Sequence, residues 1–260
     1  MPRVILGFAD AEAVAQHAAR EFVRRARAAI AASGSFKVAL AGGSTPRRSY
    51  ELLAHPSLAN QVDWEAIHVF FGDERAVPPD HPDSNYRTAF ETLLSRVKIP
   101  DAQIHRMQGE RADLDTAATE YEATLAESFD LTVESSPPRF DLVMLGMGDD
   151  GHTASLFPST GALEERRAWV VANDVPQKGT RRITLTIPVL NAARCVMFTV
   201  EGHDKAAALA AVLEGPRDPR LYPSQLIAPE DGDLLWLVDR DAAQSLAIKP
   251  QDPSHSRSLS

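Results

Sequence analysis

The segment 140–158 reads FDLVMLGMGDDGHTASLFP, and more than any other stretch it decides the fold. An apolar strand over Phe140–Leu145 runs into a loop with three glycines in the spacing G-x-G-x-x-G, which is typical of a dinucleotide site. Asp149 and Asp150 argue against that function, because they stand where a pyrophosphate would meet backbone N–H groups. Pro158 also stops any helix within two turns, whereas a dinucleotide fold needs a full crossover helix. We therefore expect a loop that holds His152 at the carboxyl end of a buried strand, where open α/β sheets bind ligands.

Working outward from this strand, apolar strand-like segments alternate with amphipathic helix-like segments along the chain. Most of the strand-like segments are apolar without alternation, which is typical of parallel strands covered on both faces. The pattern predicts an α/β fold with a doubly wound, mainly parallel sheet and helices on both faces. The expected strands are 36–41, 66–71, 140–145, 168–172, 182–187, 195–200 and 234–238, and the expected helices are 10–32, 46–53, 85–94, 112–129, 203–213 and 240–246. We expect one domain over residues 1–248 and a disordered tail over 249–260, which is polar and carries two prolines and four serines.

Composition narrows the function classes. The formal net charge of −9 disfavours nucleic acids and anionic membranes as partners. The longest apolar runs are too short to span a bilayer, and the amino terminus lacks the architecture of a signal peptide, so we expect a cytoplasmic protein. The single cysteine, Cys195, lies in an apolar strand and is expected to be inert core. If the substrate is an anion, its site must be a local cationic patch.

A glycine loop follows the strand 36–41. Its sequence Gly42-Gly43-Ser44-Thr45-Pro46 lets the backbone turn sharply and approach a ligand. Pro46 suits the first helical position, which would leave Thr45 or Ser44 as the N-cap. Free N–H groups, two hydroxyls and the positive end of the helix dipole would then converge on one anion, and we expect a phosphomonoester. The alternative is a tight βα turn with an ordinary cap.

A second polar loop, Gly72-Asp73-Glu74-Arg75, follows the strand 66–71 and precedes Ser84-Asn85. Two acids and an arginine at the carboxyl end of a strand suit proton chemistry beside an anion clamp. A solvated polar turn is the alternative. The expected position on the same sheet edge as the other two loops favours the functional interpretation.

Together the Gly42–Pro46, Gly72–Arg75 and Gly148–Pro158 motifs resemble the 6-phosphogluconolactonase family, which shares its fold with amino-sugar-phosphate deaminases and isomerases. The resemblance covers nearly the whole chain, including Arg182–Thr186 and Gly202–Ala206. It implies metal-independent hydrolysis of 6-phospho-D-glucono-1,5-lactone to 6-phosphogluconate in the oxidative pentose phosphate pathway, without a cofactor. Ala76 departs from the family, which often has a bulkier residue there.

These observations together predict roles for the candidate residues. We expect His152 to act as general base, with Asp73 as the partner that orients the histidine or the water. Arg75 is expected to serve either the oxyanion or the phosphate. Arg182 and Lys205 are assigned to the phosphate mainly from the resemblance. The predicted site is therefore catalytic His152 and Asp73, with Gly43, Ser44, Thr45, Arg75, Arg182 and Lys205 for substrate and phosphate.

We expect no metal, because the histidines are scattered and none has the short spacing of a helix-borne zinc site. The expected partner is a small phosphorylated lactone, and the expected state is a monomer or weak dimer. One rival function is an amino-sugar-phosphate deaminase or isomerase, whose resemblance would demand a tyrosine after Asp73-Glu74 and a glutamate soon after His152. The other rival is a non-catalytic sugar-phosphate sensor, which would have no reason to keep His152 and Asp73 together.

Overall fold

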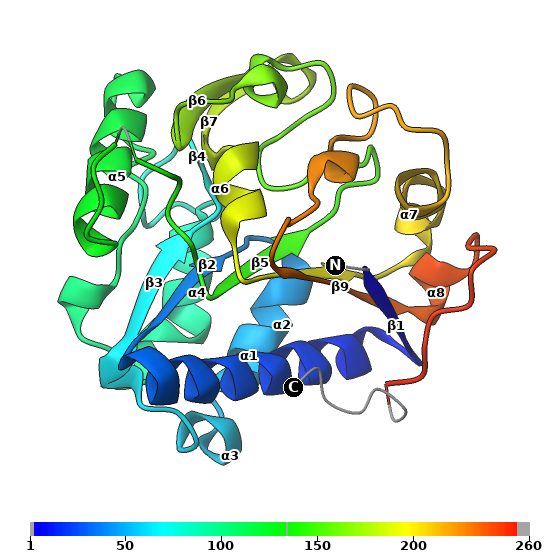
Figure 1. The fold of residues 1–260 in the computed structure, drawn as a ribbon, viewed down its shortest axis with the longest axis horizontal. Helices are drawn as coiled ribbons and strands as arrows, with labels where there is room; N and C mark the ends of the chain where they lie inside the picture. The colour runs from blue at the N-terminus through cyan, green and yellow to red at the C-terminus, as the bar shows by residue number, and fades with distance from the viewer. Residues whose placement is uncertain (1–2, 134, 254–260) are drawn as a thin grey trace.

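A six-stranded sheet forms the centre of the fold (Figure 1), which we describe from a computed structural model for residues 3–133 and 135–253. The strands follow the order β1-β9-β8-β5-β2-β3, and every neighbouring pair is parallel. They are β1 (Val4–Phe8), β2 (Phe36–Leu40), β3 (Ile67–Phe71), β5 (Leu142–Gly146), β8 (Cys195–Val200) and β9 (Asp233–Asp239). The doubly wound, mainly parallel sheet predicted from the sequence is confirmed.

Helices and a small sheet bury both faces of the central sheet. The helices are α1 (Ala11–Ser33), α2 (Ser44–Leu53), α3 (Pro56–Ala59), α4 (Asn85–Thr92), α5 (Leu114–Ser128), α6 (Ile187–Ala192), α7 (Ala206–Leu213) and α8 (Arg240–Ala243). Successive residues of β5 show why its sequence is continuously apolar: Leu142 and Met144 join the core under α1 and α2, whereas Val143 and Leu145 join the core under α5 and α7. A strand that is buried on both faces has no polar side to show.

A second sheet was not predicted. Strands β4 (Asp73–Arg75), β7 (Thr180–Leu185) and β6 (Val170–Val175) form an antiparallel sheet in the order β4-β7-β6. The segments expected at 168–172 and 182–187 are therefore strands, but they pair with each other outside the central sheet. A turn at Pro176–Lys178 followed by Gly179, whose φ is 60°, joins β6 directly to β7. Such a short connection can join only antiparallel neighbours.

The two ends of the chain also differ from expectation. Val4–Phe8 forms the edge strand β1, which was not among the predicted strands. Beside it, the N–H of Gln251 donates to the carbonyl of Ile5 at 2.8 Å, and the N–H of Gly7 donates to the carbonyl of Gln251 at 2.9 Å. The expected disordered tail 249–260 thus contains a paired residue, Gln251, and its part 254–260 lies outside the described residues.

The strand order sets the place of the site. From β2 the chain moves outward to β3, and from β5 it moves the other way, through β8 to β9. Neighbouring strands β2 and β5 therefore mark the point where the winding of the sheet reverses. Ligands of open α/β sheets bind at the carboxyl ends of the strands at this point. The glycine loop follows β2 and the His152 loop follows β5, so both lie at that edge.

Candidate active site

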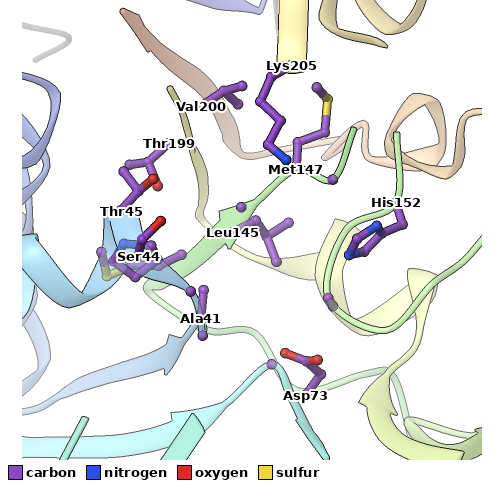
Figure 2. Close-up of a pocket in the computed structure, with 18 of the residues that line it drawn as sticks. Ala41, Ser44, Thr45, Asp73, Leu145, Met147, His152, Thr199, Val200 and Lys205 are labelled. Atoms are coloured by element: carbon purple, nitrogen blue, oxygen red, sulfur yellow. The ribbon is translucent and has the colours of Figure 1, made fainter. Parts of the chain in front are cut away.

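A pocket of about 430 Å³ opens at the carboxyl ends of β2, β3, β5 and β8. Figure 2 shows Ser44 and Thr45 on one side of it, His152 on the other, and Lys205 and Asp73 above and below in this view. All the residues predicted for the site line this one pocket, although they come from five separate parts of the chain. They are Gly43, Ser44, Thr45, Asp73, Arg75, His152, Arg182 and Lys205.

The glycine loop enters its helix earlier than predicted. α2 begins at Ser44, and its N-cap is Gly43, whose φ of 110° is a conformation that residues with a Cβ rarely adopt. The expected N-cap at Ser44 or Thr45 is therefore wrong, and no side chain caps this helix. The first-turn N–H groups, which have no partner within a helix, lie at the pocket with the positive end of the helix dipole. This arrangement favours an anion.

His152 is held by Asp150. Its Nδ1 lies 2.5 Å from Asp150 Oδ1, and its backbone N–H donates to the same oxygen at 3.0 Å. Burial alone would raise the pKa of Asp150, but these hydrogen bonds from His152 outweigh it and lower that pKa to about 2. The carboxylate therefore stays ionised at neutral pH, which fixes the Nδ1 proton toward Asp150 and leaves Nε2 as the basic nitrogen.

The predicted pairing of His152 with Asp73 is not found, because the loop itself supplies the carboxylate two residues earlier. The sequence signal for this pairing is the Asp150-Gly151-His152 triplet, in which Asp150 also argues, with Asp149, against pyrophosphate. Gly151, with a φ of 75°, turns the backbone so that residues 150 and 152 meet. Gly148 leaves the space, since a Cβ there would lie 2.0 Å from His152 Nδ1.

The His152 loop is also fixed from outside. The imidazole stacks on the buried ring of Phe157 with 4.0 Å between ring centroids. The N–H and Oγ of Ser224 both donate to the carbonyl of Gly151, at 3.0 and 2.8 Å. A side chain that is packed and hydrogen-bonded in this way needs little reorganisation during a reaction.

Asp73 is buried, with 5% of its surface exposed, and neutral donors hold it. Ser155 Oγ donates to Oδ2 at 2.7 Å, and Asn85 Nδ2 donates to Oδ1 at 3.1 Å. The nearest cation is Arg182, whose Nη1 lies 3.9 Å from Oδ2. Neither Ser155 nor Asn85 was assigned a role from the sequence, although Ser155 lies in the Gly148–Pro158 motif and Asn85 in the Ser84-Asn85 pair downstream of Gly72–Arg75.

Three cations, Arg75, Arg182 and Lys205, line the pocket together with the carboxylates of Asp73, Glu201 and Asp204. Arg75 on β4 lies directly opposite Arg182 on β7, and among the described residues the Nε of each is buried without a hydrogen-bond partner. Burial lowers the pKa of Arg182, but a guanidinium stays charged at neutral pH. Lys205 Nζ lies 3.0 Å from Asp204 Oδ2. Like charges on opposite residues destabilise a strand pair, so an anion between the arginines would be stabilising.

Thr199 and Glu201 also line the pocket and were missed. Both lie at the carboxyl end of the predicted strand 195–200, so the rule that placed the other loops at this edge could have found them. In the described part of the chain, no group of three or more histidine, cysteine or acidic side chains is placed to hold a metal. Within the same residues, no helix has the length and apolarity needed to cross a membrane.

The fold and this site define a class of sugar-phosphate enzymes, and comparison with known proteins agrees. Residues 9–236 match the family described as "Glucosamine-6-phosphate isomerases/6-phosphogluconolactonase". The chain belongs to this family.

Within the family, the similar proteins include lactonases. The chain is 45% identical over 218 residues to the 6-phosphogluconolactonase of Synechocystis sp., which covers 84% of this chain and 88% of the relative. The crystal structure of 6-phosphogluconolactonase from Thermotoga maritima is similar with a TM-score of 0.77 at 30% identity, covering 92% of this chain and all of the other. A monomeric glucosamine-6-phosphate deaminase has a TM-score of 0.76 at 22% identity, which shows a shared fold alone.

Proposed function

We propose that this chain hydrolyses 6-phospho-D-glucono-1,5-lactone to 6-phospho-D-gluconate, a step of the oxidative pentose phosphate pathway. One observation carries the proposal: an imidazole paired with an ionised carboxylate lies in the same pocket as a helix amino terminus and three cations. That arrangement brings a base and an anion grip to one small molecule. The relatives named 6-phosphogluconolactonase support the same reaction.

The chemistry begins at His152. Nε2 takes a proton from water while the water oxygen attacks the lactone carbonyl carbon, and the carbonyl oxygen becomes an oxyanion. The tetrahedral intermediate then collapses, the bond to the ring oxygen breaks, and the imidazolium returns its proton to that oxygen. Asp150 stabilises the imidazolium between the two steps and keeps its orientation. The product is an open-chain acid, which ionises at neutral pH.

The grip on the far end of the substrate falls to the first turn of α2, with Ser44 and Thr45, and to Arg182 and Lys205. Several donors around one phosphate would hold the lactone carbonyl near His152. Arg75 lies opposite Arg182 and serves either the phosphate or the oxyanion. Asp73 is hydrogen-bonded to Ser155 and Asn85, whereas His152 is paired with Asp150.

The deaminase alternative is disfavoured by two positions. Arg75 stands where the deaminase resemblance demands a tyrosine, and Thr153–Pro158 contains no glutamate for ring opening. A sensor would need the anion grip alone, and the Asp150–His152 pair would then have no use. A cytoplasmic location and a monomeric or weakly dimeric state remain predictions from the sequence.

The test compares two substrates. We expect acid release from freshly made 6-phosphogluconolactone well above spontaneous hydrolysis, no ammonia from glucosamine 6-phosphate, and no deuterium in the carbon skeleton when turnover proceeds in heavy water. A lactonase moves protons only on oxygen, whereas a deaminase or isomerase must move one between carbons. Ammonia release, or deuterium at C2 of a hexose phosphate, would place the chain on the other branch of the family.

A further inference from the structure

Ser155 is a fully buried serine whose hydroxyl has no part in the mechanism above. Its position is fixed on both sides of the backbone: its N–H donates to Thr184 Oγ1 at 3.2 Å, and its carbonyl accepts from Asn173 Nδ2 at 2.9 Å. The hydroxyl donates to Asp73 Oδ2 at 2.7 Å. A serine held this firmly fixes the carboxylate that it contacts.

The β4–β7 pairing places the Asp73 carboxylate beside Arg182, to which it would otherwise bind directly. Asp73 lies opposite Thr184, and Arg75 lies opposite Arg182, so Asp73 and Arg182 are diagonal neighbours within reach of each other. Both are largely buried, and a buried carboxylate beside a guanidinium normally closes to a direct, often bidentate, hydrogen bond. Here the nearest atoms, Nη1 and Oδ2, stay 3.9 Å apart, beyond hydrogen-bond distance.

Neutral donors account for this separation. Ser155 occupies Oδ2, and Asn85 occupies Oδ1 of the same carboxylate. Arg182, whose Nε also lacks a partner among the described residues, is left with donors that no protein acceptor has taken. Asp73 still supplies the negative charge that makes burial of the guanidinium tolerable.

We propose that Ser155 is a positioning residue that holds Asp73 away from Arg182 and so keeps the Arg182 guanidinium available to the phosphate of the ligand. This rests on the proposed function only in taking a sugar phosphate as the ligand. Without the Ser155 hydroxyl, Asp73 Oδ2 moves to Arg182 and competes with the phosphate. Asp73 is then a competitor whose removal restores binding.

The test is a binding measurement with stable probes. The dissociation constant of 6-phosphogluconate is measured by titration calorimetry in the wild type, Ser155→Ala, Asp73→Asn and the double variant. We expect Ser155→Ala to weaken binding about tenfold, because one charged hydrogen bond of the phosphate is lost. Asp73→Asn should bind within about threefold of wild type, and so should the double variant. The dissociation constant of inorganic phosphate should follow the same order across the four proteins, whereas that of unphosphorylated gluconate should not.

This recovery separates the proposal from a merely structural role, since a second mutation does not repair damaged packing. Equal binding by wild type and Ser155→Ala, or a double variant as weak as Ser155→Ala, overturns it. Thr92→Ala, which removes another buried hydroxyl outside the pocket, should leave the dissociation constant unchanged. If Ser155→Ala unfolds, Ser155→Cys keeps a donor of similar shape that is weaker and should give a smaller loss that Asp73→Asn also repairs.

Failure of the proposed function would look different. A wild type that binds 6-phosphogluconate in the expected order across these variants, but does not hydrolyse the lactone, contradicts the lactonase function and leaves the role of Ser155 standing. Hydrolysis of the lactone with equal binding by all the variants supports the lactonase function and contradicts the proposed role of Ser155.

Discussion

Asp150→Asn tests the pairing that the sequence did not predict. The variant keeps the size of the side chain at 2.5 Å from His152 Nδ1 and removes its charge. Lowering the pKa of Asp150 from 3.8 to about 2 corresponds to roughly 2 kcal/mol in favour of the ionised carboxylate beside the histidine. Because 35% of the Asp150 side chain is exposed, solvent screening reduces this to about 1 kcal/mol.

A loss of about 1 kcal/mol in stabilising the imidazolium is roughly a fivefold loss in kcat. The loss in kcat is larger if the amide also rotates the imidazole or changes its tautomer. The same Asp→Asn change beside the catalytic histidine of a serine protease lowers kcat about 10⁴-fold for this reason. KM should change little, because Asp150 does not line the pocket.

The assay is lactone hydrolysis at neutral pH, corrected for the spontaneous reaction. Asp149→Asn is the matched control, since it removes the same charge from the neighbouring residue, whose side chain is exposed. The kcat of this variant should stay within about twofold of the wild-type value. Equal kcat values for the two variants would refute the assignment of Asp150 as the partner of His152.

Three further predictions concern the glycine loop, acid stability and metals. Gly42→Ala should weaken substrate binding and cost about 1–3 kcal/mol of unfolding free energy, because its Cβ would lie 1.7 Å from Asn85 Oδ1. Gly161→Ala is the control, because a Cβ there meets nothing within 4 Å. Equal thermal stability of the two variants would contradict this prediction. Burial, then the positive charges of His68 and Lys37, lower the pKa of His105 to about 4, so the unfolding free energy should fall as pH drops from about 6.5 to 4, where only the unfolded chain takes up the proton. His105→Gln should flatten that part of the profile, and an unchanged slope in the variant would count against the buried neutral imidazole. Activity should survive dialysis against a chelator, and activity that is lost and then restored by one metal would show that a metal is required.

The sequence predicted most of the central sheet because its buried strands are mainly apolar, with Lys37 in β2 and His68 in β3 as exceptions, and are followed by glycine or polar residues. The same rule placed the loops after β2, β3 and β5 at one edge, and the structure brings their candidate side chains into one pocket. The edge strand β1 was missed although its sequence, VILGF, is as apolar as the predicted strands, so the same rule could have found it. Pairing of the β6–β7 hairpin outside the main sheet depends on contacts that no local pattern contains.

Within the site, the residue types were predictable and their partners were not. His152 could be chosen from its loop, but two carboxylates, Asp73 and Asp150, were available to it. Only the left-handed turn at Gly151 decides in favour of Asp150, and Ser155 and Asn85 engage Asp73 from elsewhere in the fold. The N-cap of α2 was misplaced because a glycine with positive φ can begin a helix without any capping side chain.

The most direct test of the central claim is acid release from freshly made 6-phosphogluconolactone by the wild type, His152→Ala and His55→Ala, each measured against spontaneous hydrolysis. His55 is an exposed histidine at the start of α3 and controls for the loss of an imidazole as such. The account predicts rapid hydrolysis by the wild type and His55→Ala, and a rate about 10²–10⁴-fold lower in His152→Ala with the fold intact. Near-wild-type turnover by folded His152→Ala would contradict general-base catalysis at this histidine.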